Sequence, residues 1–557
     1  MRNNHQTNSS TAHLANQALP VFTNSTISAL TINKNNTTRG INMCDMLAIL
    51  NLINTHIQYI KRCPSLYYLS IINNHNMEIL KSSSLREVIL QSCVHMRRIY
   101  LFHANKLTLN KMHHIQHIRA PCVSSLTIAN MDIAKLPFIL CATFPRMKIL
   151  RVDNSKSFNL LEEINMSMTK SISLYNCDIS EIYGLHNLNN LTIEGCNKLK
   201  LLVDVRNANK ITIEKCDRLV AIRALDKIGS CKISQCSSLS MITDMKCKHL
   251  TIQYCFALIS IPSINIGDLI IDRCPFLVNI EINDYTHKLT INECYSFEGI
   301  SFHYRNDSSY SDLTIKLVGS NSIINIKDWY ATKLIIEDNR TIENIQNVYN
   351  LIEMSLINCT DIEQISNLPL DILAIESCSS LETIDGLYGL SDIVVSDCPL
   401  LYDIQLMLSE LHIVSIDQCP QLSLIFDGSN LTKMDINDCG AIIPLNSKEN
   451  AQISIFNATL LDDFISEAPA YNLNKRIEYL LHAALIIMRR LHTYTTRIKF
   501  IKFKKLVKED MRECPICQEI LYPCTTCFTR CGHAFHQDCL SRWLNIRRSC
   551  PLCNGQL

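Results

Sequence analysis

Apolar positions recur with a period of about 20 residues along most of the chain, from about residue 46 to about residue 455. One copy of the repeat reads Leu191-x-Ile193-x-x-Cys196-x-x-Leu199. The Leu-x-Ile pair alternates with period two, which is typical of a short strand with one buried face. The cysteine follows where the chain leaves the strand, and the last leucine fills the core behind it. The pattern therefore predicts a long array of stacked repeats, each with one short strand.

The marker position of the repeat, Cys196 in the copy above, is usually a cysteine. Successive markers from Cys177 to Cys294 are 19 or 20 residues apart. A small side chain with a weak hydrogen-bond donor suits a buried turn, and thiols are often fully buried. Neighbouring turns could instead join their thiols in a disulfide or metal ladder, but the marker also accepts Asn, Met and Val, which a ladder would not tolerate. The markers besides Cys196 are Cys93, Met112, Met131, Cys177, Cys216, Cys236, Cys255, Cys274, Cys294, Val318, Asn339, Cys359, Cys378, Cys398, Cys419 and Cys439.

With Leu188 added at its start, this copy resembles the leucine-rich repeat in its form L-x-x-L-x-L-x-x-N/C-x-x-L. The resemblance implies a solenoid of short 19–21-residue repeats over residues 46–455, with parallel β-strands. So short a period leaves too little chain for a full helix on the convex side, where we expect irregular segments, as 3₁₀ turns or extended chain. The concave side is the expected surface for a protein substrate. Its candidate residues are Thr192, Glu194, Thr212, Glu214, Gln253, Tyr254, Asp272 and Arg273.

The regions on either side of the repeats differ from them in composition. Residues 1–45 are rich in Asn, Thr and Ser and are predicted to be a polar, partly disordered tail that runs into a first irregular repeat. Residues 456–512 contain an amphipathic helical pattern followed by a basic stretch, and we expect a helical cap or linker there. A dimerisation helix and attraction to an anionic membrane or to RNA are the alternatives for this region. The apolar run Tyr479–Met488 is too short to span a bilayer.

Composition narrows the classes of function. The 557 residues include 53 Lys and Arg and 52 Asp and Glu, so the formal net charge is +1. This balance argues against a globally basic nucleic-acid binder and against an acidic disordered protein. The N-terminus lacks the apolar core of a secretory signal, so we expect a reducing compartment, the cytoplasm or the nucleus. In such a compartment the 27 cysteines are free thiols or metal ligands rather than a disulfide framework.

The C-terminal segment, residues 513–557, contains eight cysteines and histidines with regular spacing. Thiolates and imidazoles are the ligands that zinc prefers. A segment this short cannot form a sufficient hydrophobic core, so bound metal would supply much of its folding free energy. Cys524 and Cys527 form a further C-x-x-C, which we interpret as loop cysteines. The eight residues follow the order Cys514-x2-Cys517-x13-Cys531-x-His533-x2-His536-x2-Cys539-x10-Cys550-x2-Cys553.

This order, and local runs such as Cys-Pro-Ile-Cys and Cys-Gly-His-Ala-Phe-His, resemble the RING finger in its two-histidine (RING-H2) form. The resemblance implies a cross-braced fold with two structural Zn²⁺ ions. Both ligand shells would be complete, which leaves no open position for a catalytic water. The implied ligands of the first zinc are Cys514, Cys517, His536 and Cys539, and those of the second are Cys531, His533, Cys550 and Cys553.

RING fingers act as E3 ubiquitin ligases that hold a ubiquitin-charged conjugating enzyme (E2) close to a substrate lysine, without forming a thioester themselves. The resemblance places the E2 contacts at Ile516, Trp543 and Pro551. Trp543 could also be an ordinary core residue. Many active RING fingers carry Arg or Lys directly after the last zinc ligand, where this chain has Asn554. We expect this difference to weaken the activity or to restrict it to particular E2 enzymes.

Two hypotheses of function follow. In the first, the chain is a RING-type E3 ligase whose repeats recruit a protein substrate and whose RING finger recruits the charged E2. In the second, favoured by Asn554, the chain is a non-catalytic scaffold with a structural zinc finger. Binding to nucleic acid is disfavoured, and a dimer stays open because many RING fingers pair. The abundance of Asn and Ile suggests an AT-rich genome of a large DNA virus or a protist, and for a virus the compartment would be the host cytoplasm.

Overall fold

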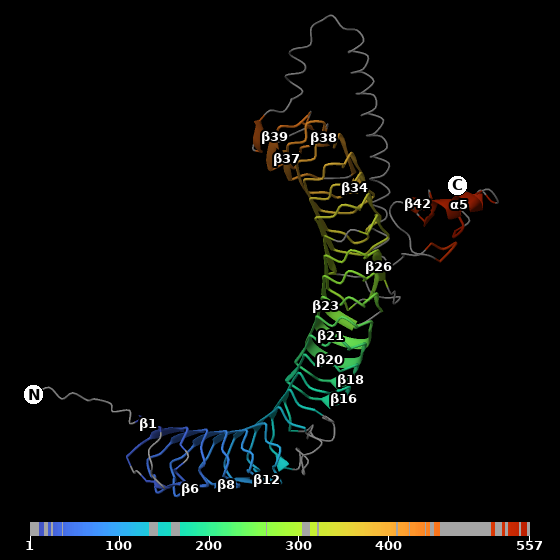
Figure 1. Cartoon of the computed structure of the whole chain (residues 1–557). Helices are drawn as coiled ribbons and strands as arrows, with labels where there is room; N and C mark the ends of the chain where they lie inside the picture. The colour runs from blue at the N-terminus through green and yellow to red at the C-terminus, as the bar shows by residue number, and fades with distance from the viewer. Residues whose placement is uncertain are drawn as a thin grey trace, which may run out of the picture. The chain divides into compact units, whose positions relative to one another are not determined.

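The computed structural model of the chain contains two compact units, Met1–Asp307 and Ser308–Leu557. Figure 1 labels several of their strands and the C-terminal helix α5. Both units contain solenoid turns built from short strands, and the second also contains the C-terminal segment. The structure describes residues 11–15, 21–23, 26–35, 37–132, 143–156, 168–262, 265–283, 285–302, 312–319, 322–407, 410–422, 424–440, 442–445, 451–456, 514–518, 526–529, 533–544, 547 and 549–553.

A single turn of the first unit shows how the repeat folds. Strand β17 (Asn190–Glu194) is followed by a tight turn, then by β18 (Leu201–Arg206), and a second turn leads to the next repeat. Apolar side chains of both strands and of the turn between them point inward, while polar residues alternate with them outward. Each turn therefore encloses its own set of apolar side chains and stacks on the neighbouring turns. The fully buried residues of this turn are Leu191, Ile193, Cys196, Leu199, Leu202 and Val205.

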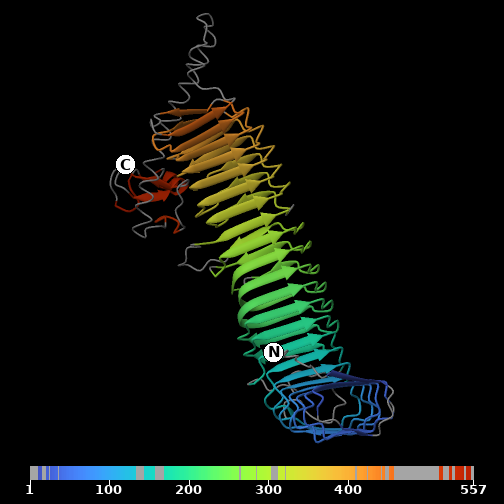
Figure 2. The same cartoon turned by 90° about the vertical axis from the view of Figure 1, so that its left-hand side faces the viewer.

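The Leu-x-Ile strands of the first unit form a parallel main ladder, which Figure 2 shows as strands lying side by side. The register places equivalent residues opposite one another, so that Leu191 lies between Ile172 and Ile211. Like side chains thus stack in continuous columns, as the repeat predicts. The strands are β1 (Thr11–Ala15), β3 (Ala29–Asn33), β5 (Ile49–Ile53), β7 (Tyr68–Ile72), β9 (Glu87–Gln91), β11 (Lys106–Asn110), β13 (Ser125–Ala129), β14 (Ile149–Asp153), β15 (Ser171–Tyr175), β17, β19 (Lys210–Glu214), β20 (Ala221–Ser234), β21 (Met241–Gln253), β23 (Asn265–Asp272) and β25 (Lys288–Asn292).

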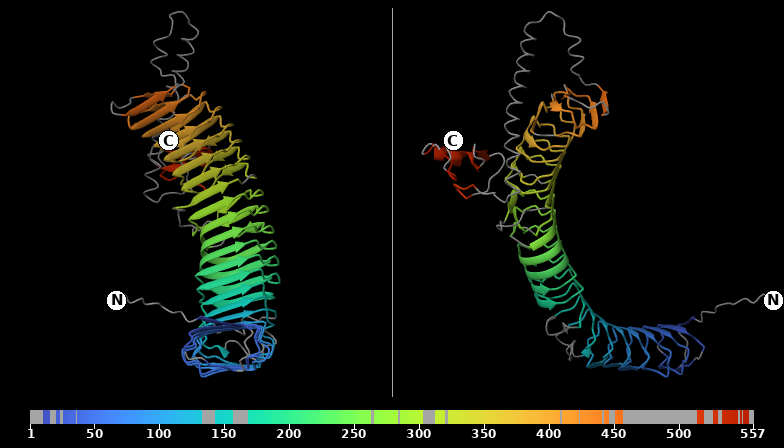
Figure 3. Two further views of the ribbon diagram at one scale, coloured as in Figure 1. Left: turned by 60° about the vertical axis from the view of Figure 1, so that its left-hand side comes forward. Right: turned by 180° about the vertical axis from the view of Figure 1, so that it is seen from behind.

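A second set of parallel strands follows the tight turns of the first unit (Figure 3). The chain is extended there, as one of the two predicted alternatives, and no 3₁₀ turn occurs among the residues that the structure describes. The long strands β20 and β21 contribute to both sets. The other strands of this second set are β2 (Val21–Phe22), β4 (Gly40–Asn42), β6 (Tyr59–Lys61), β8 (Ile79–Ser82), β10 (Arg98–Leu101), β12 (His117–Arg119), β16 (Glu181–His186), β18, β22 (Ser260–Ile261), β24 (Asn279–Ile282) and β26 (Gly299–Phe302).

The repeats of the second unit have the same organisation. Their main strands are parallel and in register, with Leu334 opposite Met354 and Met354 opposite Leu373. The main strands are β27 (Thr314–Val318), β29 (Lys333–Glu337), β31 (Glu353–Ile357), β33 (Ile372–Glu376), β35 (Asp392–Ser396), β37 (Ile413–Asp417), β39 (Lys433–Asn437) and β41 (Gln452–Phe456). The second set contains β28 (Asn325–Lys327), β30 (Asn344–Gln346), β32 (Gln364–Ser366), β34 (Thr383–Tyr388), β36 (Asp403–Met407), β38 (Leu424–Asp427) and β40 (Ile442–Leu445).

Main strands typically end at a residue with left-handed backbone conformation. Asn176 and Gly195 have φ values of 50° and 65°, and their N–H groups donate to the carbonyls of Glu194 and Glu214 in the following turns at 2.8 and 2.9 Å. The ladder thus continues by one residue into the turn before the chain reaches the cysteine marker. A Cβ atom at Gly195 would meet the side-chain oxygen of Asn176, so a larger residue there would require that side chain to move. The equivalent positions of the next turns hold Lys215 and Gln235 in the same conformation.

The marker cysteines are buried thiols that bond to their own turn. The Sγ atom of Cys216 donates to the carbonyl of Glu214 at 3.4 Å, two residues back, and several other markers repeat this bond. Burial raises the pKa of Cys93 to about 11 and that of Cys294 to about 12, so both thiols stay protonated at neutral pH. The described cysteines are all free, which agrees with packing thiols rather than a disulfide ladder.

The repeats begin earlier in the chain than the predicted boundary at residue 46. Strand β3 pairs with β5 through Leu30 and Leu50, so residues within the predicted polar tail already belong to the main ladder. Asn35 occupies the marker position there, and its buried Oδ1 accepts the N–H groups of Thr37 and Thr38 at 3.0 and 2.9 Å. The predicted boundary left this turn within the tail, because Thr38 replaces the leucine that normally follows the marker.

One predicted register in the second unit was wrong. Ile315 lies opposite Leu334, so the marker position of this repeat falls two residues after Val318, which had been assigned to it. Leu313, Ile315 and Leu317 are all buried and alternate with polar residues. Two registers therefore fit the apolar pattern equally well, and only pairing with the next strand distinguishes them.

The region between the repeats and the C-terminal segment was predicted to form a helical cap or linker over residues 456–512. Residues 457–513 lie outside the part of the chain that the structure describes, so this helix stays a prediction. Within the described residues, no helix has the length and hydropathy needed to cross a membrane.

Candidate metal centre

A short hairpin and a helix position the histidines of the C-terminal segment. Strand β42 (Thr526–Phe528) pairs antiparallel with β43 (Ala534–His536), and helix α5 (Gln537–Leu544) follows directly. The hairpin is closed by the N–H of Thr529, which donates to the carbonyl of His533 at 3.0 Å. His533 directly precedes β43 and His536 is its last residue, so the same hairpin sets the positions of both.

The apolar core of the C-terminal segment is small. Among the described residues, it contains five buried side chains, and two of these are cysteines of the predicted ligand set. Phe535 is the one large aromatic residue in this group and is fully buried. Such a core cannot stabilise a fold by apolar burial alone, which is the condition under which small domains depend on metal. The five residues are Cys514, Ala534, Phe535, Leu540 and Cys550.

Four potential metal ligands converge in a first group, Cys514, Cys517, His536 and Cys539, whose ligand atoms all lie within 4.8 Å of one another. The Sγ of Cys517 lies 3.2 Å from the Nδ1 of His536. The N–H of Gln518 donates to the carbonyl of Cys514 at 2.7 Å and closes the turn that brings the first two cysteines together. The group therefore unites residues from the Cys-Pro-Ile-Cys turn, from β43 and from α5.

A second group contains His533, Cys550 and Cys553, whose ligand atoms also lie within 4.8 Å of one another. The Sγ of Cys550 is 3.5 Å from the Nδ1 of His533. Cys531, the predicted fourth member, lies outside the described residues. The two groups interleave along the sequence, because His533 of the second group lies between Cys517 and His536 of the first. This alternation is the arrangement that a cross-braced fold requires.

Both groups fit zinc by chemistry and by geometry. A tetrahedral Zn²⁺ with sulfur at about 2.3 Å and nitrogen at about 2.0 Å holds neighbouring ligand atoms about 3.5 Å apart. The separations between Sγ and Nδ1 in the two groups, 3.2 and 3.5 Å, are close to this value. Three thiols with one imidazole form a structural zinc set, and this donor type disfavours Mg²⁺ and Ca²⁺.

The environment of Cys514 favours its thiolate form. Burial alone would raise its pKa, but backbone N–H groups of His536, Cys517 and Ile516 point at the sulfur and outweigh that effect. The pKa of Cys514 falls to about 7 as a result. The amide of His536 lies 3.5 Å from this sulfur. Because a metal binds the thiolate, these backbone groups prepare the first group for a cation.

Residues 507–554 match the RING-H2 zinc finger domain family. Residues 513–557 are called the RING-H2 segment below. The chain is also similar to parts of curated relatives. It is 37% identical over 57 residues to the E3 ubiquitin-protein ligase AIRP1 of Arabidopsis thaliana, which covers 10% of this chain and 37% of that protein. It is 38% identical over 64 residues to human RING finger protein 24, which covers 10% of this chain and 43% of that protein. The chain thus spans less than half the length of these relatives.

The repeats have weaker likenesses among solved structures. A leucine-rich repeat protein from Bacteroides ovatus aligns with 68% of this chain and 88% of its own length, at 15% identity and a TM-score of 0.24. A TM-score this low supports no argument. The strand ladders and buried columns described above show by themselves that the repeats form a parallel β-solenoid.

The predicted E2-contact residues lie at different depths in the RING-H2 segment. Ile516 is 38% exposed, although it is apolar and sits between two buried or half-buried cysteines. Pro551 and Trp543 are half-buried. The indole N–H of Trp543 donates to the carbonyl of Ser549 at 2.8 Å and so ties α5 to the turn that contains Cys550. This tryptophan therefore has a packing role, whatever else it contacts.

One exposed residue of the RING-H2 segment was missed by the sequence analysis. Leu552 is 54% exposed, more than Ile516. The two residues occupy the same place in the related runs Cys-Pro-Ile-Cys and Cys-Pro-Leu-Cys, and this internal similarity was the signal that could have identified Leu552. Asn554 and Cys524 lie outside the described residues, and Cys527 belongs to β42 rather than to either metal group.

Proposed function

We propose that the chain is a RING-H2-type E3 ubiquitin ligase, whose C-terminal segment binds the charged E2 and whose repeats bind the substrate protein. The observation that carries this proposal is the pair of interleaved Cys/His groups in a segment that matches the RING-H2 family. The name of a relative, the E3 ubiquitin-protein ligase AIRP1, supports the same class of activity.

The segment would hold two Zn²⁺ ions, and their role would be structural. The first would be held by Cys514, Cys517, His536 and Cys539, and the second by His533, Cys550 and Cys553 together with Cys531. Four protein ligands complete a tetrahedral shell, so neither ion would have a position for a substrate. When bound, the ions would fix the geometry of the two Cys-Pro-x-Cys turns and of α5.

The apolar residues on these turns would form the E2-binding surface. Exposed apolar side chains on a small domain usually mark a protein contact, and Ile516 and Leu552 are both exposed. Trp543 and Pro551 would complete the surface from half-buried positions. The hydrogen bond from Trp543 to Ser549 would keep this surface rigid, which lowers the entropic cost of binding.

The transfer itself would need no nucleophile from this chain. The ε-amine of a substrate lysine attacks the thioester carbonyl of the charged E2, an isopeptide bond forms, and the E2 thiol leaves. The chain would accelerate this step by binding both reactants and by orienting the thioester, effects of proximity rather than of a side-chain acid or base. The outward residues of the main ladder, such as Thr192 and Glu194 of β17, are candidates for the substrate contact.

The test is an in vitro ubiquitination assay of the zinc-loaded full chain with E1, ubiquitin and a panel of E2 enzymes. We expect ubiquitin ladders with at least one E2, and we expect Cys514→Ser and Ile516→Ala to abolish them. Ile516→Ala keeps all metal ligands, so it separates loss of E2 contact from loss of fold. Absence of ladders with every E2, from a chain that contains zinc, would overturn the proposal.

The second candidate function is a non-catalytic scaffold, and the observation that favours it is Asn554 in place of a basic residue. An amide is shorter than Arg or Lys and carries no charge, so it would stabilise the E2-bound ubiquitin less. Asn554→Arg separates the two candidates. A gain of activity in this variant over an inactive parent chain supports the scaffold, and activity in the parent chain supports the ligase.

A further inference from the structure

Charge is distributed very unevenly along the repeats, although the whole chain has a net charge of only +1. Residues 40–156 contain 14 Lys and Arg but 5 Asp and Glu, together with seven histidines. Residues 341–432 contain 14 Asp and Glu and no Lys or Arg. The near-neutral balance therefore conceals a basic region in the first unit, and a basic surface attracts anionic partners.

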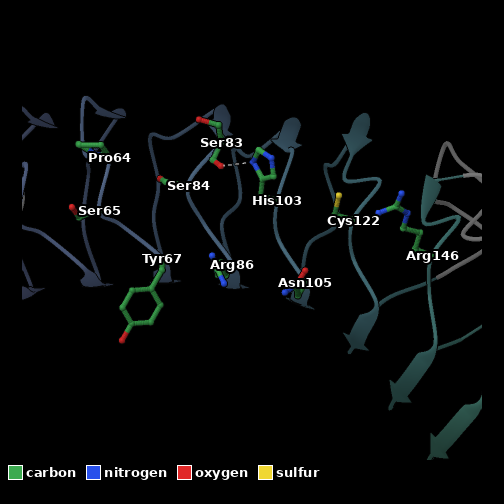
Figure 4. Close-up of a pocket in the computed structure, with 10 residues that line it drawn as sticks. All are labelled: Pro64, Ser65, Tyr67, Ser83, Ser84, Arg86, His103, Asn105, Cys122 and Arg146. Atoms are coloured by element: carbon green, nitrogen blue, oxygen red, sulfur yellow. Dashed lines mark hydrogen bonds between the residues drawn. The ribbon is translucent and has the colours of Figure 1, made fainter.

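A groove of about 830 Å³ lies within this basic region of the first unit (Figure 4). Its lining is polar and basic, with hydroxyl groups, two arginines and a histidine. The groove runs along the turns where the second set of strands leads into the main strands. The residues that matter for its chemistry are Ser65, Tyr67, Ser84, Arg86, His103 and Arg146.

The lining residues come from equivalent positions in successive turns. Ser65, Ser84, His103, Cys122 and Arg146 each stand three residues before a main strand, those from β7 to β14. Because stacked strands are about 4.8 Å apart, five such positions extend over roughly 19 Å. An extended peptide of about six residues has the same length at about 3.3 Å per residue. The groove thus has the dimensions of a short extended segment.

The cationic groups of the groove are available to a ligand. Within the described residues, neither Arg86 nor Arg146 forms an ion pair, whereas nearby Glu87 is bound to Lys106 at 2.7 Å. The Nδ1 of His103 lies 2.6 Å from the carbonyl oxygen of Ser83, which can only accept, so Nδ1 carries a hydrogen (Figure 4). This bond fixes the imidazole at the rim of the groove, between the two arginines in the stack of turns.

We infer that this groove binds an extended acidic segment of a protein partner. Arginine binds carboxylates with two parallel hydrogen bonds, and Arg86 and Arg146 stand three turns apart, so they suit two acidic side chains of one peptide. A single strand of RNA fits less well, because such strands stack on several aromatic side chains and the lining contains one Tyr, one His and no Phe or Trp. If the proposed ligase function holds, this groove would recognise the substrate.

The test is fluorescence anisotropy of the full chain with four labelled probes. These are a ten-residue peptide rich in Asp and Glu, its phosphoserine version, its Asn/Gln version and an oligouridine of equal length. We expect tight binding of the anionic peptides only. The variant Arg86→Glu/Arg146→Glu should weaken that binding at least tenfold, while Arg86→Lys/Arg146→Lys should retain part of it. The matched control Arg218→Glu/Arg223→Glu, at exposed arginines outside the groove, should change it less than twofold.

Three outcomes would overturn the inference: equal binding of the Asn/Gln peptide, tighter binding of oligouridine than of any peptide, or an equal effect of both charge reversals. If the phosphoserine peptide binds more tightly than the Asp/Glu peptide, the inference holds and phosphate is the preferred anion. If these two peptides bind equally, the inference holds and carboxylate is sufficient. Discharge of ubiquitin from E2 to free lysine needs no groove, so it should be unchanged in Arg86→Glu/Arg146→Glu. If the peptides do not bind but ubiquitin is discharged, only the inference about the groove is refuted. If the peptides bind but ubiquitin is not discharged, only the ligase proposal is refuted.

Discussion

The repeats and the RING-H2 segment of this chain are stabilised in opposite ways. A single turn such as that of β17 and β18 buries six apolar or thiol side chains, and the next turn buries an equivalent set. The RING-H2 segment buries five such side chains among its described residues, two of them cysteines that face the metal groups. The repeats thus draw their stability from neighbouring turns, whereas the RING-H2 segment must draw much of its own from bound metal.

This difference separates the two parts functionally as well as structurally. Loss of metal should disable the RING-H2 segment and leave the repeats folded. Substitution of a buried apolar residue of the repeats should lower the stability of the solenoid and leave the metal groups intact. Four experiments test the comparison, in order of decreasing expected effect.

The largest effect should come from removing metal. Chelation, or Cys514→Ser, should unfold the RING-H2 segment and abolish ubiquitin transfer, because structural zinc contributes about 10–16 kcal/mol in small zinc-finger peptides. Zinc content and proteolysis of the C-terminal residues would measure this loss. The matched control is Cys527→Ser in β42, a cysteine outside both metal groups. Equal loss of zinc in this control would contradict the ligand assignment.

The next largest effect should come from the buried column of the repeats. Ile213 of β19 is fully buried, and Ile213→Ala should lower the free energy of unfolding of the solenoid by about 2–5 kcal/mol. Urea unfolding followed by circular dichroism would measure this change. Thr212→Ala, on the outward side of the same strand, should change it by less than about 0.5 kcal/mol. Zinc content should be unaffected by either variant, and a loss of zinc in Ile213→Ala would break the comparison.

Alkaline pH should weaken the repeats through their thiols. Burial raises the pKa of Cys93 from 9.0 to about 11 and that of Cys294 to about 12. Because the folded state keeps these protons to higher pH, their contribution to stability is complete below pH 9 and is lost as the pH rises toward 11 and 12. The loss is about 1.4 kcal/mol per thiol and pH unit within this window. Urea unfolding at pH 8 and 10 would measure this loss. If the free energy of unfolding of Cys93→Ala falls as much between these pH values as that of the parent chain, the thiol explanation is wrong.

The smallest effect should come from ion pairs on the surface of the repeats. Lys232 and Glu214 lie 3.1 Å apart on neighbouring strands, but both remain partly exposed. Solvent screens such pairs, so their coupling energy in a double-mutant cycle should be below about 1 kcal/mol. A coupling energy above about 2 kcal/mol would contradict the view that burial of apolar side chains, rather than ion pairs on the surface, stabilises the solenoid.

Periodic features of this molecule could be predicted from the sequence, and local exceptions could not. The Leu-x-Ile pair and its cysteine marker predicted the main ladder, because burial of one strand face imposes period two. The resemblance of the Cys514–Cys553 motif to the RING finger predicted the two groups of potential ligands. The turn at Asn35 was left within the predicted tail because Thr38 stands where the repeat normally has a leucine. The register near Ile315 failed because three alternating apolar residues permit two alignments.

Surfaces were harder to predict than cores. The groove of the first unit unites residues that are about 20 positions apart in sequence and become neighbours only when the turns stack. Nothing in the local sequence around Arg86 or Arg146 marks them as members of one site. The net charge of +1 was also misleading, because it averages a basic region over residues 40–156 with an acidic one over residues 341–432.

The most direct test of the ligase proposal is single-turnover discharge of ubiquitin from an E2 thioester to free lysine, in the presence of the zinc-loaded full chain. We predict that the chain accelerates this discharge at least tenfold, and that Ile516→Ala loses the acceleration while it retains zinc. An E2 that binds the chain without faster discharge would contradict the account and identify the chain as a scaffold.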